Sequence, residues 1–163
     1  MGFQAKHDKD FYAWAMEQAA RLREAAASGT NLPLDWENLA EEIESMGRSD
    51  RLEVTFRLAR IVEHLLKLEL SPADRPRNGW KRSVIQQRTA LGRVLRDSPS
   101  LRAKLEEFLP NAWADGRQDA LFGLEADGLF DRDLPRECPY RLEELLDPGF
   151  WPANQHGVEQ ERG

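Results

Sequence analysis

The chain has 163 residues, of which 40% are hydrophobic and 32% are charged, and its formal net charge is −6. This composition predicts one globular domain that needs no disulfide or structural metal to fold. No apolar run reaches the roughly 18 residues of a membrane span, and the first ten residues lack the apolar core of a secretory signal. We therefore expect a cytoplasmic protein that does not enter a membrane, and its single cysteine, Cys138, excludes an internal disulfide.

The charges are unevenly distributed along the chain. Residues 75–96 have seven basic and no acidic side chains, whereas acidic residues are in excess on both sides of this segment. An acidic protein with one basic segment is not typical of general nucleic-acid binders, because their affinity grows with the number of phosphates that they neutralise. The basic residues also spread around much of the predicted helix, with Arg82, Arg93 and Arg96 pointing outward, so we expect no nucleic-acid contact.

Apolar residues recur at helical spacing through most of the chain, beginning with a helix from about Lys9 to Ala27. A second helix is expected after Asp35, a natural N-cap, with Leu34 and Leu39 spaced as a hydrophobic staple. Gly47 suits the left-handed position at which a helix ends. The buried face predicted for this second helix consists of Trp36, Leu39, Ala40, Ile43 and Met46.

A third helix, from about Asp50 to Leu70 with Ser49 as its cap, is apolar over more than half of its circumference. Such a helix must pack against several others, so we place it at the centre of the protein. Its remaining polar strip contains Glu53, Arg57, Arg60, His64 and Lys67.

Three further segments complete the predicted fold. A fourth helix, from about Asn78 to Arg96, has Gln87 inside its apolar stripe, either bonded across the bundle or lining a pocket. A fifth helix begins at Pro99 and should bend or split near Pro110, and a short helix ends the fold at residues 140–146. We thus predict an all-α, single-domain bundle of four to five helices over residues 8–151, with flexible termini at 1–7 and 152–163.

Several fragments resemble a bacterial family known as domain of unknown function 29. The most specific is DWENLAEEIESMG at residues 35–47, and it is accompanied by DFYAW at 10–14, EHLLK at 63–67 and CPY at 138–140. The resemblance covers roughly residues 8–152. It implies a small all-helical bundle without an assigned reaction, and it transfers no catalytic residues to this chain.

The second predicted helix has three carboxylates along one side, because Glu37, Glu41 and Glu44 are spaced at i, i+4 and i+7. Like charges at this spacing repel one another unless something offsets them. If Gly47 joins two antiparallel helices, the simplest partners are Arg57 and Arg60 in an interhelical ladder of ion pairs. Solvated carboxylates without partners are the other plain interpretation.

A metal site formed by Glu37, Glu41, Glu44 and His64 is the sharper alternative. Carboxylate-bridged metals in helical bundles use Glu-x-x-His pairs, and this chain has none, so we assign no metal ligand, cofactor or catalytic residue. His64 could instead be a hydrogen-bonded boundary residue whose neighbours shift its pKa in either direction.

The sequence does not define a reaction. Our leading hypothesis is a non-catalytic, cytoplasmic protein-interaction or regulatory module that binds a protein partner or itself through an exposed apolar patch, with Phe150 or Trp151 as expected members. The alternatives are a metal-dependent or carboxylate-using enzyme centred on Glu37, Glu41, Glu44 and His64, and a nucleic-acid-associated factor that uses residues 75–96.

Overall fold

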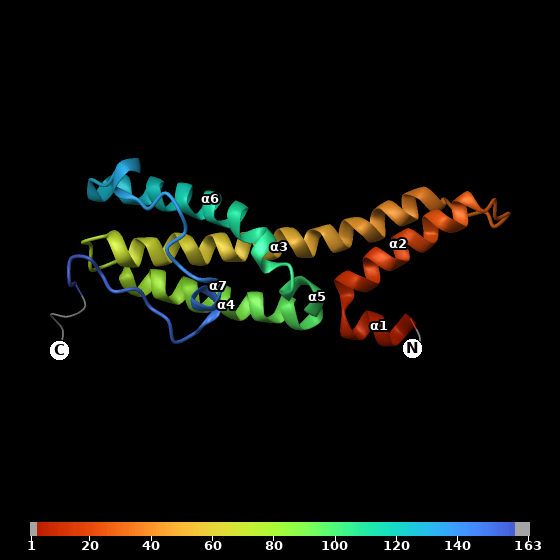
Figure 1. Ribbon diagram of the computed structural model, residues 1–163, viewed down its shortest axis with the longest axis horizontal. Helices are drawn as coiled ribbons and strands as arrows, with labels where there is room; N and C mark the ends of the chain where they lie inside the picture. The colour runs from red at the N-terminus through yellow and green to blue at the C-terminus, as the bar shows by residue number, and fades with distance from the viewer. Residues whose placement is uncertain (1–2, 159–163) are drawn as a thin grey trace. The chain divides into compact units, whose positions relative to one another are not determined.

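The computed structural model describes residues 3–158, with side chains from Lys6 onward, and its regular structure is helical (Figure 1). Residues 3–158 contain no β-strand, so the all-α prediction is confirmed. The longer helices are α2 (Phe11–Ala27), α3 (Trp36–Leu70), α4 (Arg77–Asp97) and α6 (Leu105–Leu124). The shorter elements are α1 (Phe3–Lys9), α5 (Pro99–Arg102), η1 (Glu125–Asp127), η2 (Asp131–Asp133) and α7 (Leu142–Leu146).

The chain divides into two compact units. The first contains Met1–Val54 and Arg93–Lys104, and the second contains Thr55–Gly92 and Leu105–Gly163. Helices α3 and α4 each contribute one part to each unit. The units are therefore described in turn, and the single domain over residues 8–151 stays a prediction.

Helix α3 is continuous from Trp36 to Leu70, so the predicted helix end at Gly47 and the new start at Ser49 are wrong. The left-handed conformation occurs at Gly29, Gly128 and Gly157 among the described glycines, and not at Gly47. A Cβ placed on Gly47 would meet the flexible end of Met16 and would lie 3.5 Å from Ala15 Cβ, so this glycine is packed against α2 within a continuous helix. A glycine inside a helix costs about 1 kcal/mol in helix propensity.

Small residues form the seam between α2 and the first part of α3. Ala15, Ala19 and Ala40 are at most 1% exposed, and Gly47 is buried with them. Leu39 and Met46, which we predicted to be buried, lie outside this seam and are 40% and 51% exposed.

The start of α2 and the start of α5 cap each other within the first unit. Asp10 accepts a hydrogen bond from the backbone N–H of Ala13 in its own helix and another from that of Ser100 in α5. Ser98, the N-cap of α5, accepts from the backbone N–H of Tyr12 at 3.0 Å. The two caps satisfy N–H groups that a helix start otherwise leaves without partners.

The second unit has the larger core. Its α3 portion contributes side chains that are at most 1% exposed, and these pack with buried residues of α4, α6 and α7. The principal members are Leu58, Ile61, Val62, Leu65, Leu66, Leu68, Val84, Leu91, Leu105, Ala112, Ala120, Leu124 and Leu145. The predicted apolar third helix is therefore confirmed over this part, whereas Leu52 and Phe56 are 71% and 55% exposed.

Pro110 lies inside α6, so it does not split the helix as we predicted. Because it stands in the second turn, it removes one backbone hydrogen bond and leaves the rest of the helix intact. The interruption falls earlier, between Arg102 and Leu105, where α5 ends and α6 begins.

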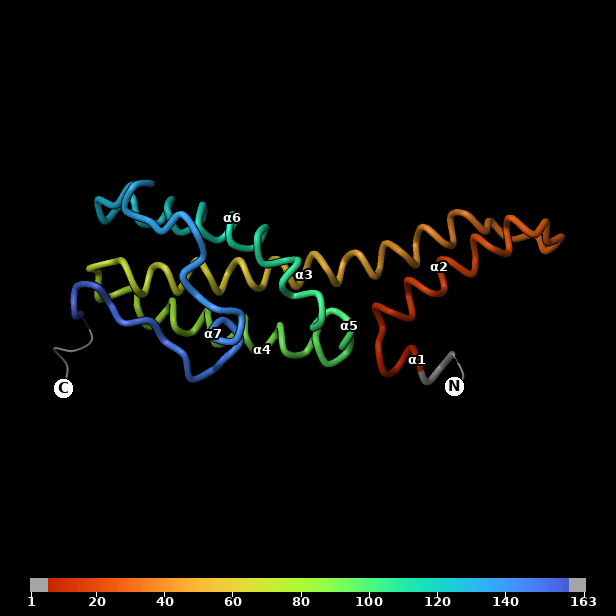
Figure 2. The backbone as a smooth tube through the Cα atoms, viewed as in Figure 1, coloured from red at the N-terminus to blue at the C-terminus, as the bar shows by residue number. Residues whose placement is uncertain are grey.

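The segment after α7 is attached to the second unit rather than frayed, which corrects our expectation for residues 152–158; residues 159–163 lie outside the described part. Asn154 Nδ2 donates to the carbonyls of Leu68 and Ser71, both at 2.8 Å. His156 contacts the carbonyl of Leu70 at 3.0 Å. These groups satisfy carbonyls that the end of α3 leaves open, and Figure 2 shows the chain returning to that end. At the other terminus, residues 3–9 form α1, and the predicted flexibility of residues 1–7 stays a prediction.

Substitution of Gly116 tests whether α6 and α3 pack so closely in the second unit that no side chain fits at this position. A Cβ at this position would lie 2.5 Å from the carbonyl oxygen of Ala59 and 2.9 Å from Val62 Cβ. Because backbone cannot move aside as a flexible side chain can, we expect Gly116→Ala to lower the free energy of unfolding by about 1–3 kcal/mol in urea titrations. Gly92→Ala is the control, since nothing lies within 4 Å of its Cβ position, and it should stabilise α4 by up to about 1 kcal/mol. Equal effects of the two substitutions would contradict this account.

Candidate functional site

The three glutamates of the predicted cluster converge on an arginine that sequence reasoning did not select. Arg23 of α2 lies 3.3 Å from Glu37, 3.6 Å from Glu41 and 2.5 Å from Glu44. Arg48, from the same helix as the glutamates, lies 2.6 Å from Glu41. The carboxylate row is thus one side of an ion-pair network that joins α2 to α3.

The network changes the proton affinity of its members. The hydrogen bonds that Arg23 donates to Glu44 and then to Glu37 raise its pKa above the ordinary value. The hydrogen bond from Arg23 lowers the pKa of Glu44. Both shifts keep the groups charged, which suits a structural ion pair better than a group that exchanges protons near neutral pH.

The other three members of the predicted cluster belong to the second unit. Arg57 donates to Gln87 Oε1 at 2.9 Å, so the amide in the apolar stripe of α4 has a bonded partner. Arg60 lies 2.5 Å from Glu63 and 3.6 Å from Asp119 of α6. Since α3 is continuous, the helical hairpin on which we based the pairing of Arg57 and Arg60 with the glutamate row does not form at Gly47.

His64 is buried beside a buried carboxylate. Its Nδ1 donates to the carbonyl of Arg60 at 2.8 Å, and its side chain is 9% exposed. Glu63, only 4% exposed, is held between Arg60 and Lys67, the latter at 2.6 Å. Burial is the main cause that lowers the pKa of His64 from its ordinary 6.5, whereas the hydrogen bond to the Arg60 carbonyl and the charge of Glu63 oppose the shift. A lowered pKa favours the neutral form of the ring.

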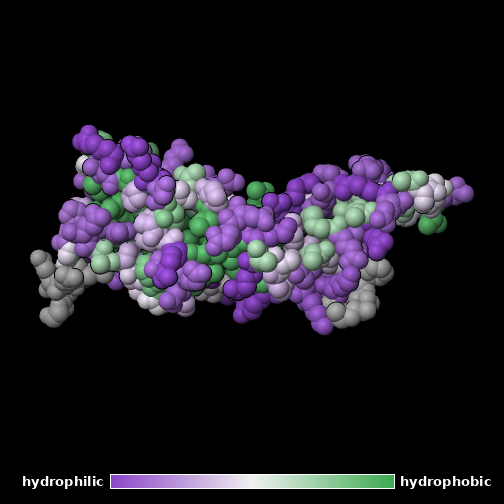
Figure 3. Space-filling view, viewed as in Figure 1, coloured by the Kyte–Doolittle hydropathy of each residue, from purple (hydrophilic) through white to green (hydrophobic). Residues whose placement is uncertain are grey.

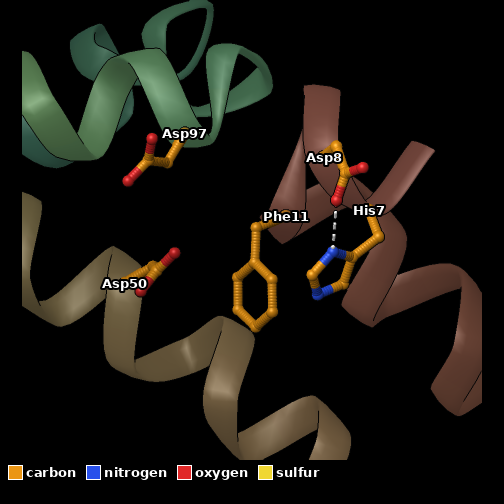
Figure 4. Close-up of a pocket in the computed structure, with 5 residues that line it drawn as sticks. All are labelled: His7, Asp8, Phe11, Asp50 and Asp97. Atoms are coloured by element: carbon orange, nitrogen blue, oxygen red, sulfur yellow. Dashed lines mark hydrogen bonds and ion pairs between the residues drawn. The ribbon is translucent and has the colours of Figure 1, made fainter. Parts of the chain in front are cut away.

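A hollow of about 320 Å³, which we did not predict, opens within the first unit. It is lined by His7 and Asp8 of α1, Phe11 of α2, Asp50 of α3 and Asp97 of α4. Figure 4 shows the ring of Phe11 between His7 and Asp50, with Asp97 on the neighbouring end of α4. These residues are far apart along the chain, so no local motif could have indicated their proximity.

The electrostatics of this hollow are acidic. Burial raises the pKa of Asp50, and the neighbouring Glu53 and Asp97 raise it further, whereas a hydrogen bond from Ser98 at 3.2 Å opposes the shift. His7 contacts Asp8 at 3.0 Å and packs edge-on against Trp14. Among the residues with described side chains, no group of three or more His, Cys, Asp or Glu is arranged to hold a metal ion.

The basic segment separates into structural and exposed residues. Arg88 is 8% exposed and donates to the carbonyls of Glu144, Leu145 and Phe150. Arg77 donates to the carbonyl of Leu68. Only part of the positive charge of residues 75–96 therefore faces solvent, including Arg82, Arg93 and Arg96.

The aromatic residues that we expected on an exposed patch are not fully exposed. Trp151 is half-buried, with the Arg88 guanidinium 5.3 Å from the centre of its ring and Lys81 Nζ at 5.8 Å. Phe150 is half-buried and packs against Tyr140. Both residues fasten the C-terminal segment to the second unit.

Exposed apolar side chains occur instead beside the small-residue seam of the first unit. Leu32, Leu34, Leu39 and Met46 are 61%, 52%, 40% and 51% exposed, and we name these four the hairpin ridge. Leu39 and Met46, with half-buried Ile43 between them, share one face of α3 because their spacing is i, i+4, i+7. Figure 3 shows apolar atoms at the surface near the loop between α2 and α3. Sequence patterning missed the ridge, because it assigned Leu39 and Met46 to the core.

Comparisons with known proteins agree with this helical architecture. The family model described as "Domain of unknown function DUF29" matches residues 7–151. A crystal structure of an alpha-helical protein of unknown function from Rhodospirillum rubrum is similar, with a TM-score of 0.74 and 26% sequence identity over 88% of this chain and 90% of that chain. The comparison with curated proteins gives no match. Within residues 3–158, no helix has both the length and the apolar character needed to cross a membrane.

The burial of His64 predicts that the second unit becomes less stable as the pH falls. Because burial lowers its pKa in the folded chain, the unfolded chain binds the proton more tightly. The stability that neutral His64 contributes is present above the unfolded pKa and is lost as the pH falls toward the folded pKa. An NMR titration should give a His64 pKa below 6.5. When the pH is lowered from about 7.5 to 5, the free energy of unfolding measured in urea should fall more for the wild type than for His64→Gln. Identical pH dependence of the two proteins would contradict the assignment.

Proposed function

The chain belongs to the DUF29 family, and we propose that it is a non-catalytic, cytoplasmic protein-interaction module whose partner binds the hairpin ridge. The observation that carries the proposal is the exposure of four large apolar side chains beside a seam of small residues. Scattered exposed apolar residues are ordinary, but Leu39 and Met46 share one face of α3, and apolar residues that share an exposed face are typical of a surface that becomes buried in a complex.

The packing of α2 against α3 supports this interpretation. The residues buried in the seam include Ala15, Ala19, Ala40 and Gly47. The larger apolar residues Leu39 and Met46 of α3 are not buried there. Leu39 and Met46 stand at the edge of the seam, where another helix could cover them. Burying the exposed parts of the four ridge residues would contribute on the order of 4 kcal/mol before the costs of association.

The polar clusters favour binding over catalysis. Arg23 and Arg48 engage the glutamate row, and their hydrogen bonds stabilise its charged state. His64 donates its Nδ1 proton to a backbone carbonyl next to a carboxylate that is already paired with two cations. Groups held in this way serve packing and orientation, so they support a module that acts through its surface.

Substitution of the ridge tests the proposal. We expect Leu39→Ser with Met46→Ser to abolish capture of a partner by the tagged full-length protein from native lysate, because the double substitution removes the apolar contact area. Leu52→Ser is the matched control. It makes the same change at a 71% exposed leucine of the same helix, and helical spacing places it away from Leu39 and Met46.

Thermal unfolding followed by circular dichroism separates lost binding from lost structure. Because all the substituted positions are substantially exposed, each variant should retain its helicity and lose about 1 kcal/mol of stability or less. Partner capture by the folded double variant at the wild-type level would contradict the proposed surface. Loss of capture with Leu52→Ser alone would contradict it as well.

A further inference from the structure

The hairpin ridge has an acidic border on α3. Glu42 is three residues after Leu39 and four before Met46, so it neighbours both on the helix surface. It is exposed, and it forms none of the ion pairs found among residues 6–158. Asp35, four residues before Leu39, is also exposed, and it accepts hydrogen bonds from Asn38 rather than from a cation. Negative charge beside the ridge is therefore not neutralised.

The opposite side of the same helix is different. There, Arg23 and Arg48 offset the row formed by Glu37, Glu41 and Glu44. The segment from Ser28 to Val54 has seven acidic residues and two basic ones, and one of the two, Arg48, is already used by this row. The uncompensated charge is thus concentrated on the side of the helix that exposes Leu39 and Met46.

The carboxylates beside the hairpin ridge distinguish two possible partners, a second copy of this chain and a different protein with basic residues. A second copy of the chain, packed ridge to ridge, would place Glu42 of one copy close to the carboxylates of the other. Like charges brought together in an interface cost free energy and suppress that pairing. A partner with lysine or arginine beside its apolar residues would gain from the same carboxylates.

We propose that the hairpin ridge binds a basic amphipathic helix of another protein. This inference rests on the proposed function and specifies the partner's chemistry. Leucine-like residues of the partner would cover Leu34, Leu39 and Met46, and its basic residues would approach Glu42 and Asp35. A helix suits the ridge because its side chains can lie along two turns of α3 and complete a three-helix layer with α2 and α3.

Designed peptides test the chemistry directly. Three fluorescent peptides of about 18 residues, long enough to form a helix, share one leucine pattern and have lysine, glutamine or glutamate at the remaining positions. We expect full-length protein to bind the lysine peptide at least ~10-fold more tightly than the glutamate peptide in fluorescence anisotropy at low salt, and the difference should shrink as salt is added.

Four protein variants assign the binding to the ridge. Leu39→Ser with Met46→Ser should abolish binding of the lysine peptide, whereas Leu52→Ser should leave it unchanged. Glu42→Lys should weaken it by about tenfold. Glu106→Lys is the charge control, because it makes the same change at an exposed position of α6, and it should have little effect.

The outcomes separate this inference from the proposed function. Ridge-dependent binding of the glutamine or glutamate peptide with equal or greater affinity would overturn the basic-helix inference and leave the proposed function standing. Ridge-dependent dimerisation of the protein, seen by sedimentation, would have the same consequence. Binding of the lysine peptide that survives the double serine substitution, or equal losses with Glu42→Lys and Glu106→Lys, would overturn the inference as non-specific attraction. Absence of ridge-dependent binding to any peptide, together with unchanged partner capture by the double variant, would overturn both.

Discussion

The close approach of α2 to α3 is the constraint on which the first unit depends. With no Cβ at Gly47 and with alanines at positions 15, 19 and 40, the two helices meet through backbone and methyl groups. The same seam brings Arg23 to the glutamate row, which fixes the charge state of that side of α3. Leu39 and Met46 lie outside this contact and are 40% and 51% exposed. The ion-pair network and the exposed apolar surface thus both lie beside one helix contact.

The second unit uses large apolar residues and pairs its buried charges. Leucines, isoleucine and valine of α3 fill its core, and Glu63 is buried only together with Arg60 and Lys67. Arg88 shows the same principle, because its guanidinium donates to the carbonyls of Glu144 and Leu145 in α7 and to that of Phe150 after the helix. Buried polar groups with complete partners hold a unique arrangement at low cost. This unit therefore stabilises the fold, and the first unit exposes the surface with which we associate function.

Helical periodicity and caps were sufficient to predict most elements. Asp35, the predicted cap, accepts a hydrogen bond from the backbone N–H of Asn38 in α3, and the prolines at 72 and 76 lie in the gap between α3 and α4. Gly47 could not be assigned from sequence, because a glycine that ends a helix and one that admits a neighbouring helix look the same in one dimension. The same error affected the predicted site. With a helix end at Gly47, Arg57 and Arg60 were the expected partners of the glutamates. The partner in the structure is Arg23, which lies on the preceding helix. The hollow lined by His7, Asp50 and Asp97 depends on contacts between distant segments, which periodicity does not encode.

The central claim is that Leu39 and Met46 form a surface for a partner rather than an incompletely formed core. Hydrogen–deuterium exchange of the full-length protein, with and without the lysine peptide, tests this claim most directly. The account predicts added protection in the backbone of residues 32–46, no added protection around residues 105–124, and no change when Leu39 and Met46 are serine. Equal protection throughout the chain, or protection that persists in the double variant, would contradict it.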